Sequence, residues 1–417
     1  MEKKLVLQVR DNFERVRIVG VLGWGLSAQG AAYLARKKLN KKIMISTTQE
    51  ELSTSEEKLA RSLEAEVELG GHSVDFLKKA DIWIVSPGVK PHSEALEILR
   101  KIKIPWVGEI EFASWFCPAP IIAVTGTNGK TTTVAKISHM FNIAGRKHFL
   151  LGNMGSSFAK AMADISPSDW VVLEVSSFQL NYTFTFKPFI ACLLNFSPNH
   201  LDWHSSIEDY FFAKSKIFIN QSESDYALFS SPLADKLEDI YSRCHILEEG
   251  SDTSDFVRIV GEALGFSSSV IQKAISTFKN LPHRLEFVRN VKGVNFINDS
   301  KSTTPASTVW ALQKIEGRVI LIAGGQDKGL DYSCLNPYLK KVKKVFLIGS
   351  ARQKIAGSLS ETVDWEYRDS LEEAVDSAYK IAGRGENVLL SPMCASFDSF
   401  SNFEERGNVF KRKVYQL

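Results

Sequence analysis

The strongest constraint on the fold is a short apolar run that leads into a glycine-containing turn and then into helical spacing. Residues 120–124 predict a buried strand, and the next segment is Thr125-Gly126-Thr127-Asn128-Gly129-Lys130-Thr131-Thr132. Apolar residues at helical spacing follow, at Val134, Ile137, Met140, Phe141 and Ala144. Such a turn closes backbone N–H groups around phosphate oxygens, and the helix N-terminus adds positive potential. The pattern predicts a nucleoside triphosphate site in an α/β fold.

Within this turn, Lys130 is placed to reach the terminal phosphates, and Thr131 is placed to offer its hydroxyl to Mg²⁺. The remaining ATP-binding candidates of the turn are Gly126, Thr127, Asn128, Gly129 and Thr132. The usual phosphate-loop pattern has a glycine six residues before the lysine, where this chain has Val124. The alternative is an ordinary glycine-rich turn before a helix.

Length and composition narrow the class of protein. A chain of 417 residues predicts about two or three domains. A formal net charge of +3 gives no reason to expect a nucleic acid partner. The five cysteines are scattered and form no C-x-x-C pair, which favours a reducing cytoplasm. The first apolar run, 16–24, is short and interrupted by glycines, so we expect neither a signal peptide nor an integral membrane segment.

The first segment alternates short apolar strands with helices. A strand at 16–22 leads into Gly23-Trp24-Gly25-Leu26-Ser27-Ala28, and a helix is predicted at 31–38, with further strands at 42–46 and 82–85. This order predicts a parallel, Rossmann-like sheet. The turn fits a dinucleotide fingerprint loosely, but the second strand ends in Ser46 and Thr47 without an acidic residue, so NAD is weakly supported.

The rest of the chain continues the alternation. Further strands are predicted at 170–173, 190–195, 225–229, 294–297, 318–323, 344–348 and 387–390, and C-terminal helices at 304–314, 371–381 and 403–414. We therefore predict an α/β protein with three domains. These are a Rossmann-like domain at 1–108, a central P-loop-type ATPase domain with a parallel sheet at 109–281, and a second Rossmann-like domain at 282–417.

Polar residues at strand ends are the other candidates for chemistry. Glu174 ends a strand of the phosphate-loop segment and could bind Mg²⁺, although it could also be a partly exposed acid. His200 follows another strand, but a lone histidine is more often structural. Lys214, taken alone, is typical of a solvated helix position. The polar turn at 298–305 could hold a carboxylate or phosphate through Lys301 or simply cap a helix, and Cys394 has no positioned histidine to support a nucleophile.

Eleven motifs in order, covering nearly the whole chain, resemble the Mur ligase family, and most closely its branch that adds D-glutamate to UDP-N-acetylmuramoyl-L-alanine. They are GWGLS, SPGV, TGTNGKTTT, GNMG, LEVSSFQL, NFSPNHLDWH, AKSKI, LPHRLE, INDSKSTTP, AGGQDKGLDY and SPMCASFDSFSNFEERG. The resemblance implies an ATP-dependent amide ligase of peptidoglycan precursor synthesis that works through an acyl phosphate.

The resemblance also implies roles for single residues. Lys130, Glu174, His200 and Lys214 would be the catalytic set, with two Mg²⁺ ions held by Thr131, Glu174, His200 and a Lys214 carbamylated by CO₂. Arg284 and Asp299 would close over the nucleotide. The UDP precursor would meet Gly25, Leu26, Ser27, Ser46, Thr47, Asn153 and Ser177. D-Glutamate would meet Lys301, Thr303, Lys328, Ser396, Phe397 and Phe403. Domain closure and a monomer are expected.

Two departures from the family pattern accompany this prediction. Relatives often carry a His-Asn-x-x-Asn element whose asparagine contacts adenine, whereas this chain has a different, shortened stretch at 255–261. Position 397 is Phe where many relatives have Leu. The alternatives are a sister ligase for another amino acid, a folylpolyglutamate synthase-like enzyme, or a regulatory protein that has lost catalysis. The Asp-Asn-Pro-Arg pattern of the diaminopimelate-adding branch is absent, and the retained catalytic set argues against lost activity.

Overall fold

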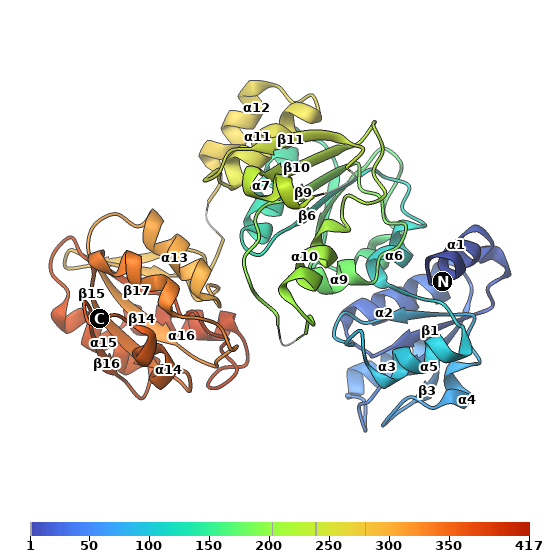
Figure 1. Ribbon diagram of the computed structural model, residues 1–417, viewed down its shortest axis with the longest axis horizontal. Coiled ribbons are helices and arrows are strands. Elements are labelled where there is room, and N and C mark those ends of the chain that lie inside the picture. Colours follow the sequence, from blue (N-terminus) through green and yellow to red (C-terminus); the bar gives the residue numbers. More distant parts are fainter. Residues whose placement is uncertain (1, 202, 238–239, 280) are drawn as a thin grey trace. The chain divides into compact units, whose positions relative to one another are not determined.

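The computed structural model describes residues 2–201, 203–237, 240–279 and 281–417 (Figure 1). The chain forms two compact units, an N-terminal unit (Met1–Phe278) and a C-terminal unit (Lys279–Leu417). The N-terminal unit contains two sheets and the C-terminal unit contains one. The predicted α/β class with three sheet-based parts is confirmed, while the domain bounds at 108 and 281 stay a prediction.

The first sheet has five parallel strands in the order β3-β2-β1-β4-β5. They are β1 (Ile18–Leu22), β2 (Lys42–Ser46), β3 (Glu66–Glu68), β4 (Ile82–Val85) and β5 (Trp106–Gly108). The accompanying helices are α1 (Glu2–Asp11), α2 (Leu26–Tyr33), α3 (Thr54–Ser62), α4 (Val74–Leu77), α5 (Glu94–Ile102) and α6 (Glu109–Ser114).

The helix predicted at 31–38 begins earlier than expected. Helix α2 starts at Leu26 directly after the extended residue Gly25, and Leu34–Lys38 form a π-helical turn. The first turns of α2 consist mainly of small residues, so large apolar side chains do not recur there at helical spacing. One of them, Gly30, allows close contact with Ser157, because a Cβ there would overlap the serine hydroxyl. Small residues at the start of α2 serve this close contact, and the sequence pattern therefore did not reveal the helix there.

The central sheet has six parallel strands in the order β11-β10-β9-β6-β8-β7. They are β6 (Ile121–Thr125), β7 (His148–Gly152), β8 (Trp170–Glu174), β9 (Ile190–Leu193), β10 (Tyr226–Ser230) and β11 (Arg243–Leu247). One face packs on α7 (Lys130–Ile143), α11 (Thr253–Ala263) and α12 (Ser268–Thr277). The other face shares a continuous apolar core with the first sheet and is accompanied by α8 (Phe158–Ala161), α9 (Ser177–Asn181) and α10 (Ile207–Ser215). This shared core makes the two sheets one unit.

The C-terminal sheet has the order β12-β13-β17-β14-β15-β16. Its strands are β12 (Glu286–Val291), β13 (Val294–Asn298), β14 (Val319–Gly324), β15 (Val342–Ile348), β16 (Asp364–Tyr367) and β17 (Asn387–Leu390). Its helices include α13 (Pro305–Lys314), α14 (Arg352–Ser358), α15 (Leu371–Ile381) and α16 (Phe403–Tyr415). Strand β12 is antiparallel to β13, and the others pair in parallel. The two-residue turn Lys292-Gly293 has positive φ at both positions, which is typical of a tight hairpin.

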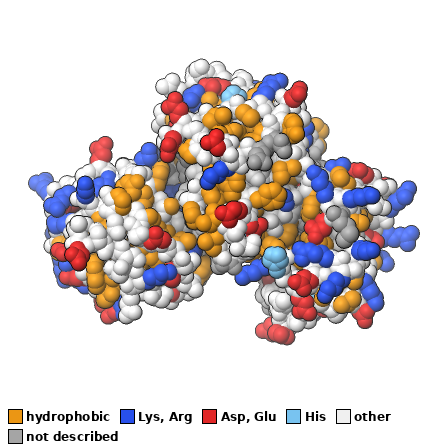
Figure 2. Space-filling model, viewed as in Figure 1, with side chains coloured by type: hydrophobic (Ala, Val, Ile, Leu, Met, Phe, Trp, Pro, Cys, Tyr) orange, Lys and Arg blue, Asp and Glu red, His pale blue; other side chains and the backbone are white. Residues whose placement is uncertain are grey.

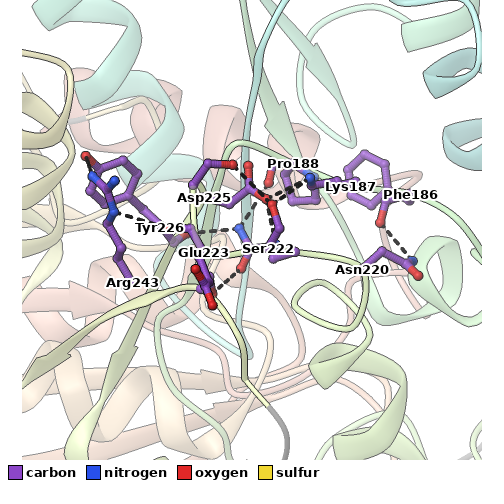
Figure 3. A network of polar contacts seen from close by, with 12 residues as sticks. Phe186, Lys187, Pro188, Asn220, Ser222, Glu223, Asp225, Tyr226 and Arg243 are labelled. Carbon is purple, nitrogen blue, oxygen red and sulfur yellow. Dashed lines mark hydrogen bonds and ion pairs between the residues drawn. The ribbon is translucent and has the colours of Figure 1, made fainter.

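A polar network fastens the amino ends of β9 and β10 (Figure 3). The buried carboxylate of Asp225 accepts a hydrogen bond from Ser222 N at 2.7 Å and pairs with Lys187 Nζ at 3.1 Å. Arg243 at the start of β11 donates to the carbonyl oxygen of Glu223 and to the hydroxyl of Tyr226. These contacts lie at the end of the sheet opposite the carboxyl ends of its strands, so they stabilise the fold and leave the other end for chemistry.

The surface agrees with the nearly balanced composition. On the face shown in Figure 2, Lys and Arg side chains are interspersed with Asp and Glu side chains on both units. Within the described ranges, no helix has both the length and the apolar character needed to cross a bilayer.

Candidate active site

The phosphate loop between β6 and α7 is held by the segment that follows β9. Asn195 accepts a hydrogen bond from Asn128 N through its Oδ1 at 2.9 Å and from Thr127 N through its carbonyl oxygen at 3.1 Å. Gly126 and Gly129 have φ values of +151° and +82°, a region that favours glycine. The loop therefore lies at the carboxyl ends of two neighbouring parallel strands, where α/β sheets bind ligands. Asn195 was missed as a site residue, and its position directly after an apolar strand was the available signal.

Two lysines meet at one carbonyl oxygen of this loop. Lys130 Nζ donates to the carbonyl oxygens of Gly126 at 2.8 Å and Thr127 at 2.9 Å. Lys214 Nζ, from α10, donates to the same Gly126 oxygen at 2.8 Å. Lys214 is only 1 % exposed, and burial, followed by the charge of Lys130, lowers its pKa well below the usual value. The interpretation of Lys214 as a solvated charge is therefore wrong, because burial favours the neutral form of this amine.

Glu174 ends β8, which pairs with β6, the strand that leads into the phosphate loop. Its side chain is 2 % exposed, and Oε1 accepts a hydrogen bond from Asn153 Nδ2 at 2.9 Å. Its Oε2 is buried and has no hydrogen-bond partner among the described residues. A buried carboxylate oxygen without a partner is costly unless a cation or donor binds it. Glu174 thus has a carboxylate oxygen that is suited to bind Mg²⁺.

The protein groups suited to Mg²⁺ are few. No cluster of three or more His, Cys, Asp or Glu side chains is arranged for a metal in the part of the chain that the structure describes. Glu174 and the hydroxyl of the 5 % exposed Thr131 are oxygen donors. Mg²⁺ usually takes one or two carboxylates and completes its shell with water and substrate phosphates. These residues fit a nucleotide-bound Mg²⁺ better than a metal site built from protein alone.

His200 lies in an aromatic cluster and has a left-handed backbone, with φ of +58°. Its ring lies 4.8 Å from that of Phe178 and 5.9 Å from that of Tyr210. Tyr210, which was missed from the sequence, contacts the Thr127 hydroxyl at 3.3 Å and lies under Lys214 Nζ at 4.7 Å. Burial raises the pKa of Tyr210 to about 12, so its hydroxyl stays neutral. Asp202, in the same motif as His200, lies outside the described residues.

A cavity of about 830 Å³ opens beside the glycine turn of the first sheet. Gly25, Leu26 and Ser27 line it, as the prediction of a precursor site requires, together with residues from the 86–95 segment and Trp203. Four side-chain atoms of the lining are buried without a hydrogen-bond partner among the described residues: Trp24 Nε1, Ser86 Oγ, Ser93 Oγ and Trp203 Nε1. Buried polar groups are rarely left unpaired, so these atoms make the wall of the cavity unusual among the described residues.

The other residues predicted for the precursor lie elsewhere in the N-terminal unit. Ser46 and Thr47 are buried at the end of β2 and do not line the cavity. Asn153 bonds Glu174, and the buried Ser177 hydroxyl bonds His204 Nε2 at 3.0 Å. Their direct contact with a precursor stays a prediction.

The C-terminal unit brings its predicted residues to the carboxyl end of its sheet. The buried carboxylate of Asp299 accepts hydrogen bonds from Leu285 N at 3.2 Å and Ser391 Oγ at 2.9 Å, and burial raises its pKa to about 6. The charge of Arg284 acts in the opposite direction.

The residues predicted for D-glutamate include two contacting pairs. Lys328 Nζ donates to Thr303 Oγ1 at 3.4 Å, and Lys301 Nζ lies 5.2 Å from the centre of the Phe403 ring. Ser396 is buried, whereas the Phe397 side chain is 69 % exposed.

Arg406 is the main residue of this unit that was missed. It is 1 % exposed and donates to Ser300 Oγ, Ser300 O, Cys394 O and Ala395 O. Its guanidinium therefore joins the loop after β13 to the loop after β17. The available signal was an arginine within the NFEERG motif on an otherwise amphipathic helix.

The stretch at 255–261, where relatives often carry the adenine element, lies within α11 (Thr253–Ala263). Asp252 caps this helix by accepting from Ser254 N at 2.6 Å. Lys136 Nζ contacts the hydroxyls of Thr253 at 3.0 Å and Ser254 at 2.7 Å. A methyl group of Thr253 lies beside the phosphate-loop residue Gly129. Helix α11 therefore begins next to the phosphate loop, although its sequence differs from the family element.

Family models match three parts of the chain. Residues 18–95 match the MurD N-terminal domain, 124–244 match the Mur ligase middle domain, and 283–394 match the Mur ligase glutamate ligase domain.

Curated relatives match this chain over most of its length. The UDP-N-acetylmuramoylalanine–D-glutamate ligase of Thermoanaerobacter pseudethanolicus is 36 % identical, with 95 % of this chain and 98 % of the relative covered. The protein of that name from Caldanaerobacter subterraneus is 38 % identical over 86 % of this chain and 89 % of the relative.

Solved structures share the fold at low identity. The MurF ligase of Thermotoga maritima in complex with ADP has a TM-score of 0.62 at 16 % identity, and 97 % of each chain is covered. The UDP-N-acetylmuramate–alanine ligase MurC of the same organism has a TM-score of 0.55 at 16 % identity, with 96 % of this chain and 100 % of the other covered.

Proposed function

This chain belongs to the Mur ligase family, and we propose that it joins D-glutamate to UDP-N-acetylmuramoyl-L-alanine at the expense of ATP, in peptidoglycan precursor synthesis. The observation that carries the proposal is similarity over nearly the whole chain to ligases named for this reaction. The phosphate loop, the unpaired Glu174 oxygen and the precursor cavity support it independently. We assign the reaction to the cytoplasm, in agreement with the scattered cysteines.

The chemical problem is an inert acid. A carboxylate repels a nucleophile and offers a poor leaving group. In the proposed reaction, a carboxylate oxygen of the L-alanyl group attacks the γ-phosphorus of ATP, and ADP leaves. The amine of D-glutamate then attacks the acyl carbon and loses a proton, and phosphate departs with the former carboxylate oxygen. Stabilising the transferring phosphoryl group is the main catalytic demand.

The residues of the phosphate loop meet this demand by charge. Lys130 donates hydrogen bonds to two carbonyl oxygens of the loop. It directly follows the loop whose N–H groups would surround the phosphates. Thr131 and Glu174 would hold Mg²⁺, with His200 near a second ion. Bound Mg²⁺ neutralises the phosphate charge. Arg284 and Asp299 are proposed for the nucleotide, and Lys301, Thr303, Lys328, Ser396, Phe397 and Phe403 for D-glutamate.

Lys214 is proposed to carry a carbamate. Its neutral amine would attack the carbon of CO₂ and lose a proton, which replaces a cation by an anionic oxygen ligand. The burial of Lys214 beside Lys130 supports this, because two ammonium groups sharing the Gly126 carbonyl repel each other.

Phosphate release over a panel of amino acids and UDP-linked precursors tests the function. We expect release only when UDP-N-acetylmuramoyl-L-alanine and D-glutamate are both present. Equal turnover with L-glutamate would contradict the assignment, and preference for another amino acid would indicate a sister ligase. With ¹⁸O in the precursor carboxylate, one labelled oxygen should appear in the released phosphate, and its absence would exclude the acyl phosphate.

A further inference from the structure

The end of β2 meets the precursor cavity through a histidine that the sequence patterns did not single out. Ser46, the last residue of β2, is fully buried and does not line the cavity. Its Oγ lies 2.7 Å from His72 Nδ1, 2.9 Å from Glu68 Oε2 and 3.1 Å from Gly71 O. His72 does line the cavity. A relay therefore runs from Glu68 through Ser46 to the cavity wall.

The relay selects one tautomer of His72. The Ser46 hydroxyl has one hydrogen, and both Glu68 Oε2 and Gly71 O can only accept. If that hydrogen points to the carboxylate, the Ser46 oxygen accepts a hydrogen bond from His72 Nδ1–H. The opposite tautomer would leave three acceptors around one hydrogen. The network thus assigns the proton to Nδ1 and leaves Nε2 as an acceptor.

Nε2 is the polar atom that His72 can offer to a ligand. Nδ1 is directed at the buried Ser46, so Nε2 lies on the other side of the ring, and it forms no hydrogen bond to any described residue. Burial, opposed by the charges of Glu68 and Glu94, lowers the pKa of His72 and favours this neutral, accepting form.

The loop that carries His72 is held in place. Glu68 also accepts from Ser73 N at 3.1 Å and from the Ser73 hydroxyl, while Gly71 N donates to Thr47 O at 3.2 Å. Ser73 in turn caps α4 by accepting from Phe76 N at 3.2 Å. Hydrogen bonds of its neighbours Gly71 and Ser73 therefore fix the backbone of His72 before a ligand binds.

In Rossmann-like sheets the first glycine turn receives the diphosphate, and an acceptor at the end of the second strand receives a ribose hydroxyl. The usual acceptor is an acid, which this strand lacks. We propose that His72 Nε2 accepts a hydrogen bond from the ribose 2′-hydroxyl of the uridine diphosphate part of the substrate, with Ser46 and Glu68 as positioning residues. The proposal rests on the proposed function and names the ribose contact of its precursor site.

The test compares UDP with 2′-deoxy-UDP by calorimetry on the full chain. Wild type should bind UDP about 10-fold more tightly than the deoxy analogue, which corresponds to one good hydrogen bond. His72→Ala should weaken UDP binding by a similar factor and abolish the discrimination, leaving deoxy-UDP affinity nearly unchanged. His72→Asn, which keeps an acceptor, should retain part of it, and Ser46→Ala should reduce it. His245→Ala, at an exposed histidine of β11, is the matched control.

The outcomes separate this inference from the proposed function. Equal weakening of UDP and deoxy-UDP in His72→Ala would overturn the ribose contact and indicate a base or diphosphate contact. Discrimination that survives the substitution would also overturn it. In both cases, amide formation by the wild type would leave the ligase assignment intact. A wild type that makes no product and binds no UDP would overturn both.

Discussion

At the scale of single residues, the site contains buried ionisable side chains, and burial disfavours the charged forms of Lys214 and Asp299. Lys214 shares the Gly126 carbonyl with Lys130, and Asp299 is buried under a hydroxyl and a backbone N–H. Glu174 has one buried oxygen without a partner among the described residues. Groups with perturbed pKa values, such as Lys214 and Asp299, are typical of functional sites. Each has a measurable consequence.

Lys214→Ala should lower kcat by roughly 10²–10³-fold, as loss of a group that stabilises the transferring phosphoryl charge does. Short carboxylic acids such as acetate should partly restore turnover by supplying the anionic oxygen. Steady-state phosphate release measures both effects. Lys236→Ala, at an exposed lysine, is the control. Full activity of Lys214→Ala without added acid would exclude the carbamate role.

Asp299→Asn should change how the stability of the C-terminal unit depends on pH. Because the folded-state pKa of Asp299 is about 6 against 3.8 for an ordinary Asp, the folded state holds this proton more tightly than the unfolded state. Its stabilising effect is complete below pH 3.8 and is lost as pH rises through 6, a fall of about 3 kcal/mol.

In Asp299→Asn this fall should be absent, so the unfolding free energy of the wild type minus that of the variant should decrease from pH 4 to pH 7. Hydrogen exchange of β17 amides, compared at equal pH, measures it. Asp364→Asn, at an exposed position, should show no such trend. A pH-independent difference for Asp299→Asn would contradict the raised pKa.

At the scale of elements, close backbone contacts fix the site. The turn after β7 lies against the end of β8, where Asn153 N donates to Glu174 O at 2.9 Å. Gly152 has φ of +97°, and a Cβ there would overlap the Glu174 carbonyl oxygen. In the C-terminal unit, Arg406 joins two loops through four hydrogen bonds from one buried guanidinium. Both arrangements fix the backbone that carries site candidates.

Gly152→Ala should destabilise the N-terminal unit by about 1–3 kcal/mol, because it combines backbone strain with a clash. It should also weaken Mg²⁺-dependent ATP binding, since β8 carries Glu174. Denaturant unfolding and nucleotide titration measure these effects. Gly145→Ala is the matched control, because Gly145 also has positive φ, at +64°, but a Cβ there meets no atom within 4 Å. Equal behaviour of the two variants would show that strain alone matters.

At the scale of the whole molecule, the groups assigned to one reaction lie on two compact units. The phosphate loop and the precursor cavity belong to the N-terminal unit, while Asp299 and the residues predicted for D-glutamate belong to the C-terminal unit. Phosphoryl transfer followed by amine attack requires all of them at one substrate, so ligand-dependent closure is expected.

Small-angle X-ray scattering tests this expectation. The radius of gyration should decrease when UDP-N-acetylmuramoyl-L-alanine and a non-hydrolysable ATP analogue are both bound, and less with either alone. The same data test the predicted monomer through the molecular mass. An unchanged radius of gyration with both ligands would contradict closure.

Local sequence determined the helices and strands whose ends are marked by clear start and stop residues. Strands β2, β4 and β17 and helix α15 have the predicted bounds, because apolar runs and polar caps act within a few residues. Short or exposed edge strands such as β3, β12 and β16 carry no such signal, since pairing with a neighbour rather than burial forms them. The turn between β6 and α7 and the position of Glu174 at the end of β8 also agree with the local prediction, because strand ends are marked by neighbouring residues in the sequence.

Only the tertiary structure decided how these residues act together. The sequence placed Lys214 on a helix, but its burial against Gly126 O depends on a contact across 88 positions of the chain. Arg406 and His72 became functional candidates in the same way, through partners supplied by other loops. Periodicity shows which face of an element is apolar. The protonation state of a side chain, the tautomer of a histidine and the hydrogen-bond partners of a carboxylate depend on neighbours that folding brings from distant segments.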